Sequence, residues 1–347
     1  MTSVNNKYDV AKVLTLVLVV FAHCSKMFSA EAAIQNFALD DALSLITSFI
    51  YSFHMPVFIA VSGSVYALCL NKGKYSNVRS FIRNKSKRLL LPYLFFSIVV
   101  VFPVLCLCDI IQGQYIVSII KNFILCIDNR HLWYVVVLFS IFVIMRILGD
   151  KLDGNKICIA AILFLFAIIP SIPVLNYLKI NKTLHMLLYF YIVYLLINNK
   201  YIGKGGKNSI IMSVISFICT FSFWFLSISI DRSSILNKEL VIIINQIASI
   251  SGIIMMYELS QLIFDSQLLE NTIVKHILKN SYGIYLFHPM IIYVMTYYMS
   301  SNFNCYISCI CLFLCSFILA DVLTELMRIF NLNIFIGEDK LAKTTIL

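Results

Sequence analysis

The chain is dominated by long apolar runs that short polar segments separate. Read with a window of about twenty residues, these runs predict ten membrane-spanning helices at 10–29, 43–70, 89–111, 131–148, 157–175, 183–199, 208–230, 239–264, 281–300 and 305–327. A transmembrane barrel is excluded because its strands would show roughly ten residues of alternating polarity. We therefore expect an all-α polytopic membrane protein, with residues 112–129 on its surface or re-entering the membrane.

The connections between the predicted spans are too short to fold separately, so we expect residues 1–347 to form a single integral-membrane domain. The first apolar run resembles a signal peptide, but residues 23–26 interrupt it before a good cleavage site. We interpret it as an uncleaved first membrane helix. Composition agrees with a membrane protein, because only 13% of residues are charged and 61% are hydrophobic, against about 25% charged in soluble domains.

The net charge of +10 indicates topology in the membrane. If the N-terminus is cytoplasmic, twenty of the 27 lysines and arginines lie in cytoplasmic segments. The other seven are Lys26, Lys121, Arg130, Lys179, Lys182, Arg232 and Lys238. This asymmetry and the even number of spans predict that both termini are cytoplasmic. We expect a multi-pass protein of the cell membrane, in bacteria the cytoplasmic membrane, and no nucleic-acid partner, which would require a basic patch on a soluble fold.

Eleven cysteines are present, and most of them fall inside apolar runs. No Cys-x-x-Cys pair and no cysteine–histidine spacing typical of a metal site occurs. We interpret these cysteines as small hydrophobic residues and predict no metal site.

The first predicted helix carries the strongest candidates for chemistry, because ionisable groups inside a membrane span are costly. Asp9 and Lys12 lie near its start, and His23 follows Lys12 after eleven residues. Eleven residues are about three helical turns, or roughly 16 Å, and return to nearly the same face. One interpretation is an interfacial ion pair with a hydrogen-bonded histidine at the helix end. The other is an imidazole that accepts a proton during catalysis.

The second predicted span contains His54 and Pro56, followed by Ser62 and Gly63. A proline inside a helix frees a backbone carbonyl and bends the helix. Small residues allow neighbouring helices to approach closely. Both features are common in membrane helices and indicate packing as readily as a site.

The segment 72–88 carries seven basic residues and no acidic residue. It fits a topology signal in contact with anionic lipid headgroups. It also fits a cytoplasmic site for a phosphate-rich ligand, with Lys85 and Arg88 one helical turn apart just before the third span.

Two further spans open with aromatic residues and histidines. Residues 131–134 (His-Leu-Trp-Tyr) start the fourth span, where an aromatic belt at the membrane interface also explains them. Residues 281–289 start the ninth span and include His288 beside Pro289. His276 precedes that span, and we expect it in a loop, exposed to solvent.

Taken together, these motifs resemble the membrane-bound acyltransferase 3 family, and within it the fucose 4-O-acetylase-like sugar O-acetyltransferases. In chain order they are Asp9-x-x-Lys12 with His23, Phe53-His54-Met55-Pro56-x-Phe58 with Ser62-Gly63, Lys85-x-x-Arg88-Leu89-Leu90-x-Pro92-Tyr93, Leu132-Trp133-Tyr134, and Ser281-Tyr282-Gly283-Ile284-Tyr285-Leu286-x-His288. Each motif alone is weakly specific, whereas their order through nearly the whole chain is specific.

The resemblance implies ten helices, a cytoplasmic acyl donor that is usually acetyl-CoA, and a hydroxyl of a surface polysaccharide or lipid-linked sugar as acceptor. It implies that His23 is the catalytic residue and that Lys12, Lys85 and Arg88 contribute to the donor site. Many members of the family carry arginine at positions 12 and 85. Lysine there keeps the charge but loses the bidentate fork that binds phosphate.

We expect His23 to act as general base on the acceptor hydroxyl, since a thioester is already activated for attack. The resemblance also permits an acyl-histidine intermediate. Candidates for substrate binding are Asp9, His54, Trp133, Tyr134, Tyr285 and His288. We expect acetyl-CoA as co-substrate without a bound cofactor, a glycan and membrane lipids as further partners, and a monomer or a homodimer.

Two other classes of function fit parts of this pattern. In a transporter or flippase for a polysaccharide intermediate or a small solute, His23, His54 and His288 would form a proton relay. A structural or assembly subunit would need none of them. Transport is disfavoured because the sequence has neither internal repeats nor matching pairs of broken helices, which mark many transporters.

Overall fold

The computed structural model describes residues 7–75, 77–149, 155–168, 172–198, 207–265, 272–299 and 303–339, and all regular structure in these ranges is helical. In chain order the helices are α1 (Lys7–Ser25), α2 (Asp41–Tyr51), α3 (His54–Asn71), α4 (Val78–Lys85), α5 (Leu91–Phe95), α6 (Phe102–Leu107), α7 (Tyr115–Ser118), α8 (Trp133–Ile147), α10 (Lys156–Ile168), α11 (Ile180–Asn198), α12 (Lys207–Ser229), α13 (Ile235–Asp265), α14 (Thr272–Tyr298) and α15 (Cys305–Ile329). Short 3-10 or π-helical segments extend several of them. The described residues therefore confirm the all-α class.

Eight helices of the described chain are long and apolar enough to cross a membrane, and they match eight of the ten predicted spans. The predicted span 157–175 is shorter in the structure, where α10 has 13 residues and Pro173, which lacks an amide hydrogen, begins a separate 3-10 segment. The predicted span 281–300 lies in α14, which has 27 residues but includes several tyrosines, His288 and Pro289. A polytopic membrane protein is thus confirmed, while ten spans and cytoplasmic termini remain predictions.

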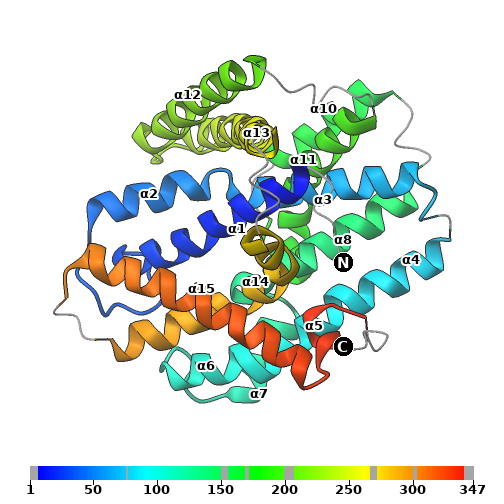
Figure 1. The fold of residues 1–347 in the computed structure, drawn as a ribbon. Coiled ribbons are helices and arrows are strands. Elements are labelled where there is room, and N and C mark those ends of the chain that lie inside the picture. Colours follow the sequence, from blue (N-terminus) through cyan, green and yellow to red (C-terminus); the bar gives the residue numbers. More distant parts are fainter. Residues whose placement is uncertain are drawn as a thin grey trace.

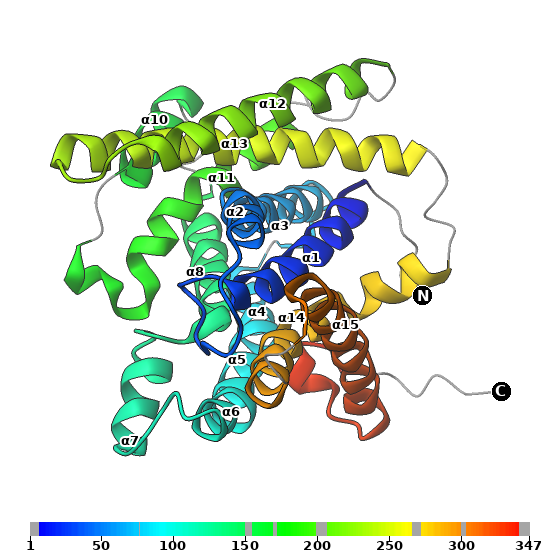
Figure 2. The same ribbon diagram turned by 90° about the vertical axis from the view of Figure 1, so that its left-hand side faces the viewer.

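Helix α1 runs through the middle of the bundle (Figures 1 and 2). It packs against α2, α3, α13, α14 and α15. Leu16, Val19 and Val20 are fully buried within it. Five neighbouring helices cover these residues, so the first apolar run becomes the core of the fold.

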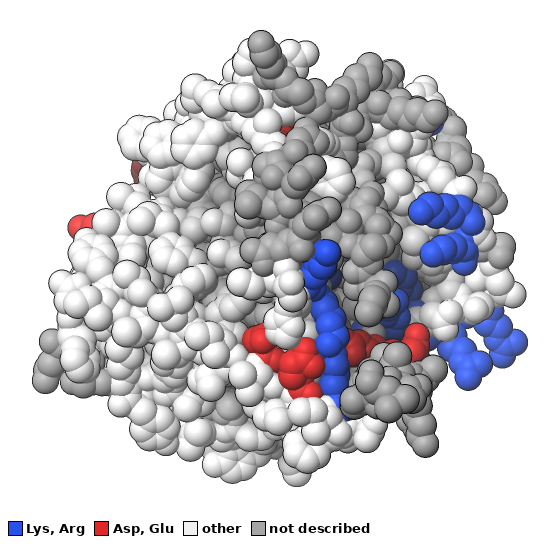
Figure 3. Space-filling model, in the orientation of Figure 1, with Lys and Arg blue, Asp and Glu red and all other residues white. Residues whose placement is uncertain are grey.

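Helices α12 and α13 form a layer across one side of this core (Figure 2). The outer residues of α12 are large and apolar, with Phe217, Ile218 and Phe225 each about half exposed. Apolar surface of this kind suits contact with lipid tails. On the face shown in Figure 3, charged side chains gather near α4 and the end of α15, and most of the remaining surface is uncharged.

The second predicted span is broken into α2 and α3 at Ser52 and Phe53. Pro56 is the third residue of α3 and not a mid-helix kink, so its missing amide hydrogen falls in the first turn, where amides lack intrahelical partners anyway. The carbonyl that Pro56 leaves free is that of Ser52, and Ser249 Oγ of α13 donates to it at 2.6 Å. Further along α3, Gly63 allows close packing, since a Cβ there would lie 2.7 Å from the Phe190 carbonyl of α11.

Two polar segments outside the predicted spans are helical. The basic segment 72–88 is largely helical, because α4 begins at Val78 with Asn77 accepting a hydrogen bond from the Ser80 amide at 3.0 Å, and helical structure then continues to Leu107. The predicted loop around His276 is wrong, whereas its predicted exposure to solvent is confirmed, since the side chain is 43% exposed. Helix α14 already begins at Thr272, and His276 contacts Asp321 of α15 at 2.8 Å. Around His276 the polar side chains find partners on the neighbouring helix α15, so polarity did not mark the end of a helix.

The segment 112–129 forms two short helical pieces beside the bundle (Figure 2). Its outer residues, such as Ile116, are exposed, whereas Phe123 and Cys126 are buried. Tyr93 Oη anchors the segment by donating to the Phe123 carbonyl at 2.5 Å. It leads directly into the 3-10 turn Arg130–Leu132 and then α8.

Candidate active site

A cavity of about 670 Å³ lies beside the end of α1 that carries His23. Its walls come from α1, the α2–α3 junction, the start of α8, and α11, α12, α13 and α14. The lining residues relevant to chemistry are His23, Lys26, Glu31, Tyr51, His54, Asp128, Arg130, His131, Trp133, Lys182, Trp224, Arg232 and Tyr285. A pocket of this size with convergent polar groups is the usual form of a small-molecule site.

His23 occupies the last turn of α1 and is partly exposed to this cavity. Its Nδ1 lies 3.4 Å from the hydroxyl oxygen of Tyr51, at the end of α2. The His23 ring centroid is 5.3 Å from that of His288 and 6.0 Å from that of Tyr51. The imidazole is thus held between α2 and α14 in the wall of the cavity.

Three other histidines surround His23, and backbone carbonyls fix their tautomers. His54 Nδ1 lies 2.9 Å from the Ile50 carbonyl, and His288 Nδ1 lies 2.8 Å from the Ile284 carbonyl. His131 Nε2 lies 3.1 Å from the Leu286 carbonyl. A carbonyl only accepts, so in each neutral ring the other nitrogen must be the acceptor. His23 differs, because its hydroxyl partner can either donate or accept.

His131 was not among the predicted site residues, since its position at the start of an aromatic run suggested an interfacial belt. In the structure it is 7% exposed, lines the cavity, and lies 6.3 Å from His288 between ring centroids. Tyr285 Oη of α14 donates to the His131 carbonyl. Tyr51 was missed too. The signal available for His131 was a histidine at the first position of a predicted span, directly after the polar residues Asp128, Asn129 and Arg130.

Five of the six residues predicted to bind substrate divide into two groups. Trp133, Tyr285 and His54 line the cavity. Tyr134 and His288 lie behind its wall: Tyr134 is 3.3 Å from Ser62 through their hydroxyls, and His288 is fully buried.

The predicted donor residues form a second basic group near the other end of α1. Lys12 lies within electrostatic range of both Asp9 and Arg88, and Lys85 lies within range of Arg88. The Lys85 ammonium is 3.7 Å from the Phe142 ring centroid. Asp9, Lys12, Lys85 and Arg88 do not form the walls of the 670 Å³ cavity. The structure therefore brings the three predicted donor-site cations together and places them away from His23.

The comparison with known families matches an acyltransferase domain model over residues 5–325, nearly the whole chain. The chain belongs to the acyltransferase 3 family. No curated protein and no solved structure shows a significant match to it. Family membership makes the protein a membrane acyltransferase.

In this member of the acyltransferase 3 family, Arg88 is held by residues 333–339, which follow α15 and which we call the C-terminal segment. Its Nε donates to the Gly337 carbonyl at 3.2 Å. Gly337 has φ of +72°, and a Cβ there would lie 2.6 Å from the Arg88 carbonyl. Only glycine combines that backbone conformation with so close an approach. Arg88 itself lies in a π-helical segment, Ser86–Leu90, a distortion common at functional sites.

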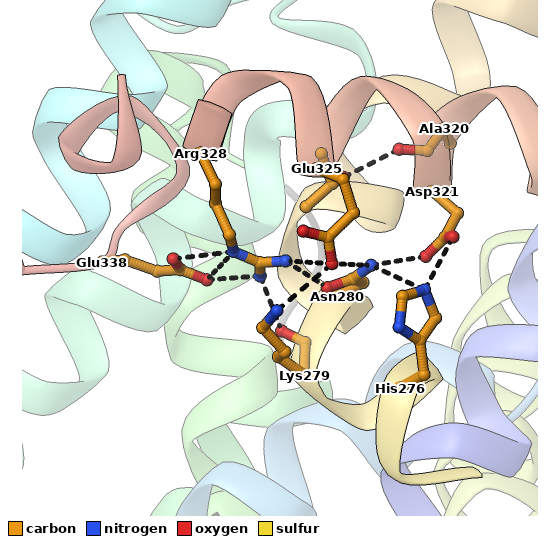
Figure 4. Close-up of polar contacts among 9 residues, drawn as sticks. His276, Lys279, Asn280, Ala320, Asp321, Glu325, Arg328 and Glu338 are labelled. Carbon is orange, nitrogen blue, oxygen red and sulfur yellow. Dashed lines mark hydrogen bonds and ion pairs between the residues drawn. The ribbon is translucent and has the colours of Figure 1, made fainter. Parts of the chain in front are cut away.

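An ion-pair network fastens this C-terminal segment to α14 and α15 (Figure 4). Arg328, whose side chain is 7% exposed, contacts Glu325 at 2.7 Å and Glu338 at 2.6 Å. Its Nη1 also donates to Asn280 Oδ1 at 2.5 Å. Glu338 is the residue next to Gly337, so the network fixes the turn that contacts Arg88.

Proposed function

We propose that the protein is an O-acetyltransferase that moves an acetyl group from cytoplasmic acetyl-CoA to a hydroxyl of a surface polysaccharide or lipid-linked sugar. The observation that carries this proposal is the placement of His23 in the wall of the 670 Å³ cavity at one end of α1, with the basic group of Lys12, Lys85 and Arg88 toward the other. Eleven residues separate Lys12 from His23, roughly 16 Å along the helix. This separation suits a donor bound by its phosphates at one end and reacting at the other.

In the proposed reaction, His23 Nε2 removes the proton of the acceptor hydroxyl while that oxygen attacks the thioester carbonyl carbon. A C–O bond forms, the C–S bond breaks, and the CoA thiolate takes a proton from the imidazolium. Base action at Nε2 requires the proton to sit on Nδ1. Tyr51 is the positioning residue for that tautomer, since its hydroxyl is 3.4 Å from Nδ1.

Replacing Lys85 by methionine is expected to raise KM for acetyl-CoA about tenfold with little change in kcat. Methionine keeps apolar contact with Phe142, whereas the lost hydrogen bond to a charged phosphate is worth about 1.5–3 kcal/mol. Initial rates over a range of acetyl-CoA concentrations measure the effect. Lys74→Met, in the exposed turn after α3, is the matched control, and an unchanged KM in Lys85→Met would remove Lys85 from the donor site.

NMR of the surface glycan from the source cells with and without the gene tests the proposed function. We expect an O-acetyl signal to disappear on deletion and to return with the intact gene. Purified protein in detergent should also melt at a higher temperature with acetyl-CoA, because a ligand that binds only the folded state stabilises it. An unchanged glycan together with unchanged melting would contradict acetyl transfer and favour a transporter.

A further inference from the structure

Four basic side chains from distant parts of the sequence meet at the cavity of His23. We call Lys26, Arg130, Lys182 and Arg232 the basic rim. Lys26 follows α1, Arg130 opens the 3-10 turn before α8, Lys182 lies in the first turn of α11, and Arg232 lies between α12 and α13. All four are at least partly exposed, whereas His54 in the same wall is buried. The rim therefore lies where the cavity opens.

The acidic residues in the wall do not neutralise this rim. They are Glu31 and Asp128, against four cations. Glu31 pairs with Lys26 at 3.7 Å with its side chain 83% exposed, and Asp128 pairs with Arg130 at 3.5 Å with its side chain 52% exposed. Long, solvent-exposed pairs of this kind are weak, so an incoming anion can displace either acid.

Lys182 and Arg232 have no carboxylate at ion-pair distance among the described residues. The charged groups that act on Lys182 are Lys179, Lys26 and Asp128, two cations and one acid. Asp231, next to Arg232, does not line the cavity, and its carboxylate accepts a hydrogen bond from the Ser233 hydroxyl at 2.5 Å. The wall thus keeps two cations in excess.

Arg130 supplies a donor without a partner. Its Nε is buried and makes no hydrogen bond within the described structure. Its backbone is left-handed, with φ of +49°, a conformation that costs energy in a residue other than glycine. Buried polar groups are normally paired, and strained residues cluster at ligand-binding sites. Both features fit a side chain set to receive a ligand.

Aromatic surfaces accompany these cations. Both tryptophans of the chain, Trp133 and Trp224, line the cavity. The Lys182 ammonium lies 4.1 Å from the Trp133 ring centroid, and Trp224 Nε1 is fixed by Ser48 Oγ at 3.1 Å. Rigid aromatic faces suit the apolar faces of sugar rings, while lysine and arginine suit carboxylate or phosphate.

We infer that the basic rim binds an anionic acceptor, a sugar that carries a carboxylate or a phosphate close to the hydroxyl that is acetylated. The inference rests on the proposed function and narrows its acceptor to a chemical class. A neutral glycan would leave the excess of two cations uncompensated at the cavity. The anion comes either from an acidic sugar residue or from the phosphate of a lipid-linked sugar.

Binding of matched sugars to the purified full-length protein tests this inference. Probes are a trigalacturonate and its carboxyl-reduced neutral counterpart, and glucose 1-phosphate and glucose. We expect at least one charged probe to bind about tenfold or more tightly than its neutral partner, a difference of about 1.4 kcal/mol or more. Whichever charged probe is preferred identifies the carboxylate or the phosphate as the source. The preference should shrink in 1 M salt, where the screening length falls from about 8 Å to about 3 Å.

Lys182→Met and Arg232→Met should reduce this preference to less than threefold without changing the dissociation constant of acetyl-CoA. Lys238→Met is the matched control, a basic residue at the start of α13 that does not line the cavity. Equal binding of charged and neutral probes, or a preference that survives both substitutions, overturns the inference. If the glycan loses its O-acetyl group on gene deletion but the probes bind equally, the inference alone fails. If the glycan is unchanged and acetyl-CoA leaves the melting temperature unchanged, the proposed function fails whatever the probes show.

Discussion

His23→Gln is expected to lower kcat for acetyl transfer by about two to four orders of magnitude, the usual contribution of a general base. Glutamine is similar in length and can still hydrogen-bond to the Tyr51 hydroxyl, which lies 3.4 Å from His23 Nδ1. It cannot accept the proton of an acceptor hydroxyl. Transfer of labelled acetyl from acetyl-CoA by the purified protein measures the effect, and KM for acetyl-CoA should change little because the predicted donor site lies away from the cavity.

Two further variants make this result specific. His276→Gln is the matched control, because His276 is on α14, partly exposed and outside the cavity wall. Tyr51→Phe should lower kcat by only about tenfold, since it removes one hydrogen bond that positions the imidazole. A His23→Gln protein that folds and keeps more than a tenth of the wild-type kcat would exclude His23 as the base.

The class of the fold could be predicted from the sequence because apolar runs long enough to span a bilayer have few alternatives. Element boundaries were less predictable. Helix α14 begins before its apolar run, at Thr272 rather than residue 281, because His276 and Asn280 find partners on α15. The second span breaks at Ser52 and Phe53, where Ser249 of a distant helix satisfies the freed carbonyl. Such partners are set by tertiary packing and leave no local pattern.

Residue spacing could relate residues of the candidate site only within one helix or one motif, whereas the ordered motifs of the family resemblance supplied His54, Trp133 and Tyr285 from three separate segments. Lys12 and His23 could be related by helical spacing, and Lys85 and Arg88 by one turn. The basic rim could not, because Arg130, Lys182 and Arg232 lie in segments that whole helices separate along the chain. All three belong to the seven lysines and arginines that lie outside the predicted cytoplasmic segments. This shared side of the membrane was the only feature of the sequence that related them.

Two acidic residues of α15 have a structural role that their position in the sequence does not indicate. Asp321 and Glu325 fall inside a predicted span, where ionisable groups suggest function. They contact His276, Lys279, Asn280 and Arg328 instead (Figure 4). Their charges are compensated by a network between α14 and α15. The position of these two acids in an apolar run therefore reflects a structural role and not a catalytic one.

Arg328→Ala is expected to destabilise the protein more than any single surface change in this network, by roughly 2–3 kcal/mol. Removing one partner of a buried ion pair costs about 3–5 kcal/mol. The figure here is lower because Glu325 and Glu338 keep 34% and 30% side-chain exposure and can regain water. Thermal melting in detergent measures the loss. Lys279→Ala, which removes one exposed contact of 3.2 Å to Glu325, should cost less than about 1 kcal/mol.

The same variant should also weaken binding of the acyl donor, because Arg328 holds Glu338 next to the Gly337 turn that contacts Arg88. Freed from that turn, Arg88 loses its fixed position, so KM for acetyl-CoA should rise while kcat falls little. Arg328→Lys keeps one cation among the carboxylates but cannot match the forked contacts of the guanidinium. We expect its melting temperature and its KM for acetyl-CoA to lie between those of Arg328→Ala and the wild type. Unchanged melting of Arg328→Ala would show that the carboxylates are stabilised without it. A lower melting temperature with unchanged KM would show that Arg88 is positioned without the C-terminal turn.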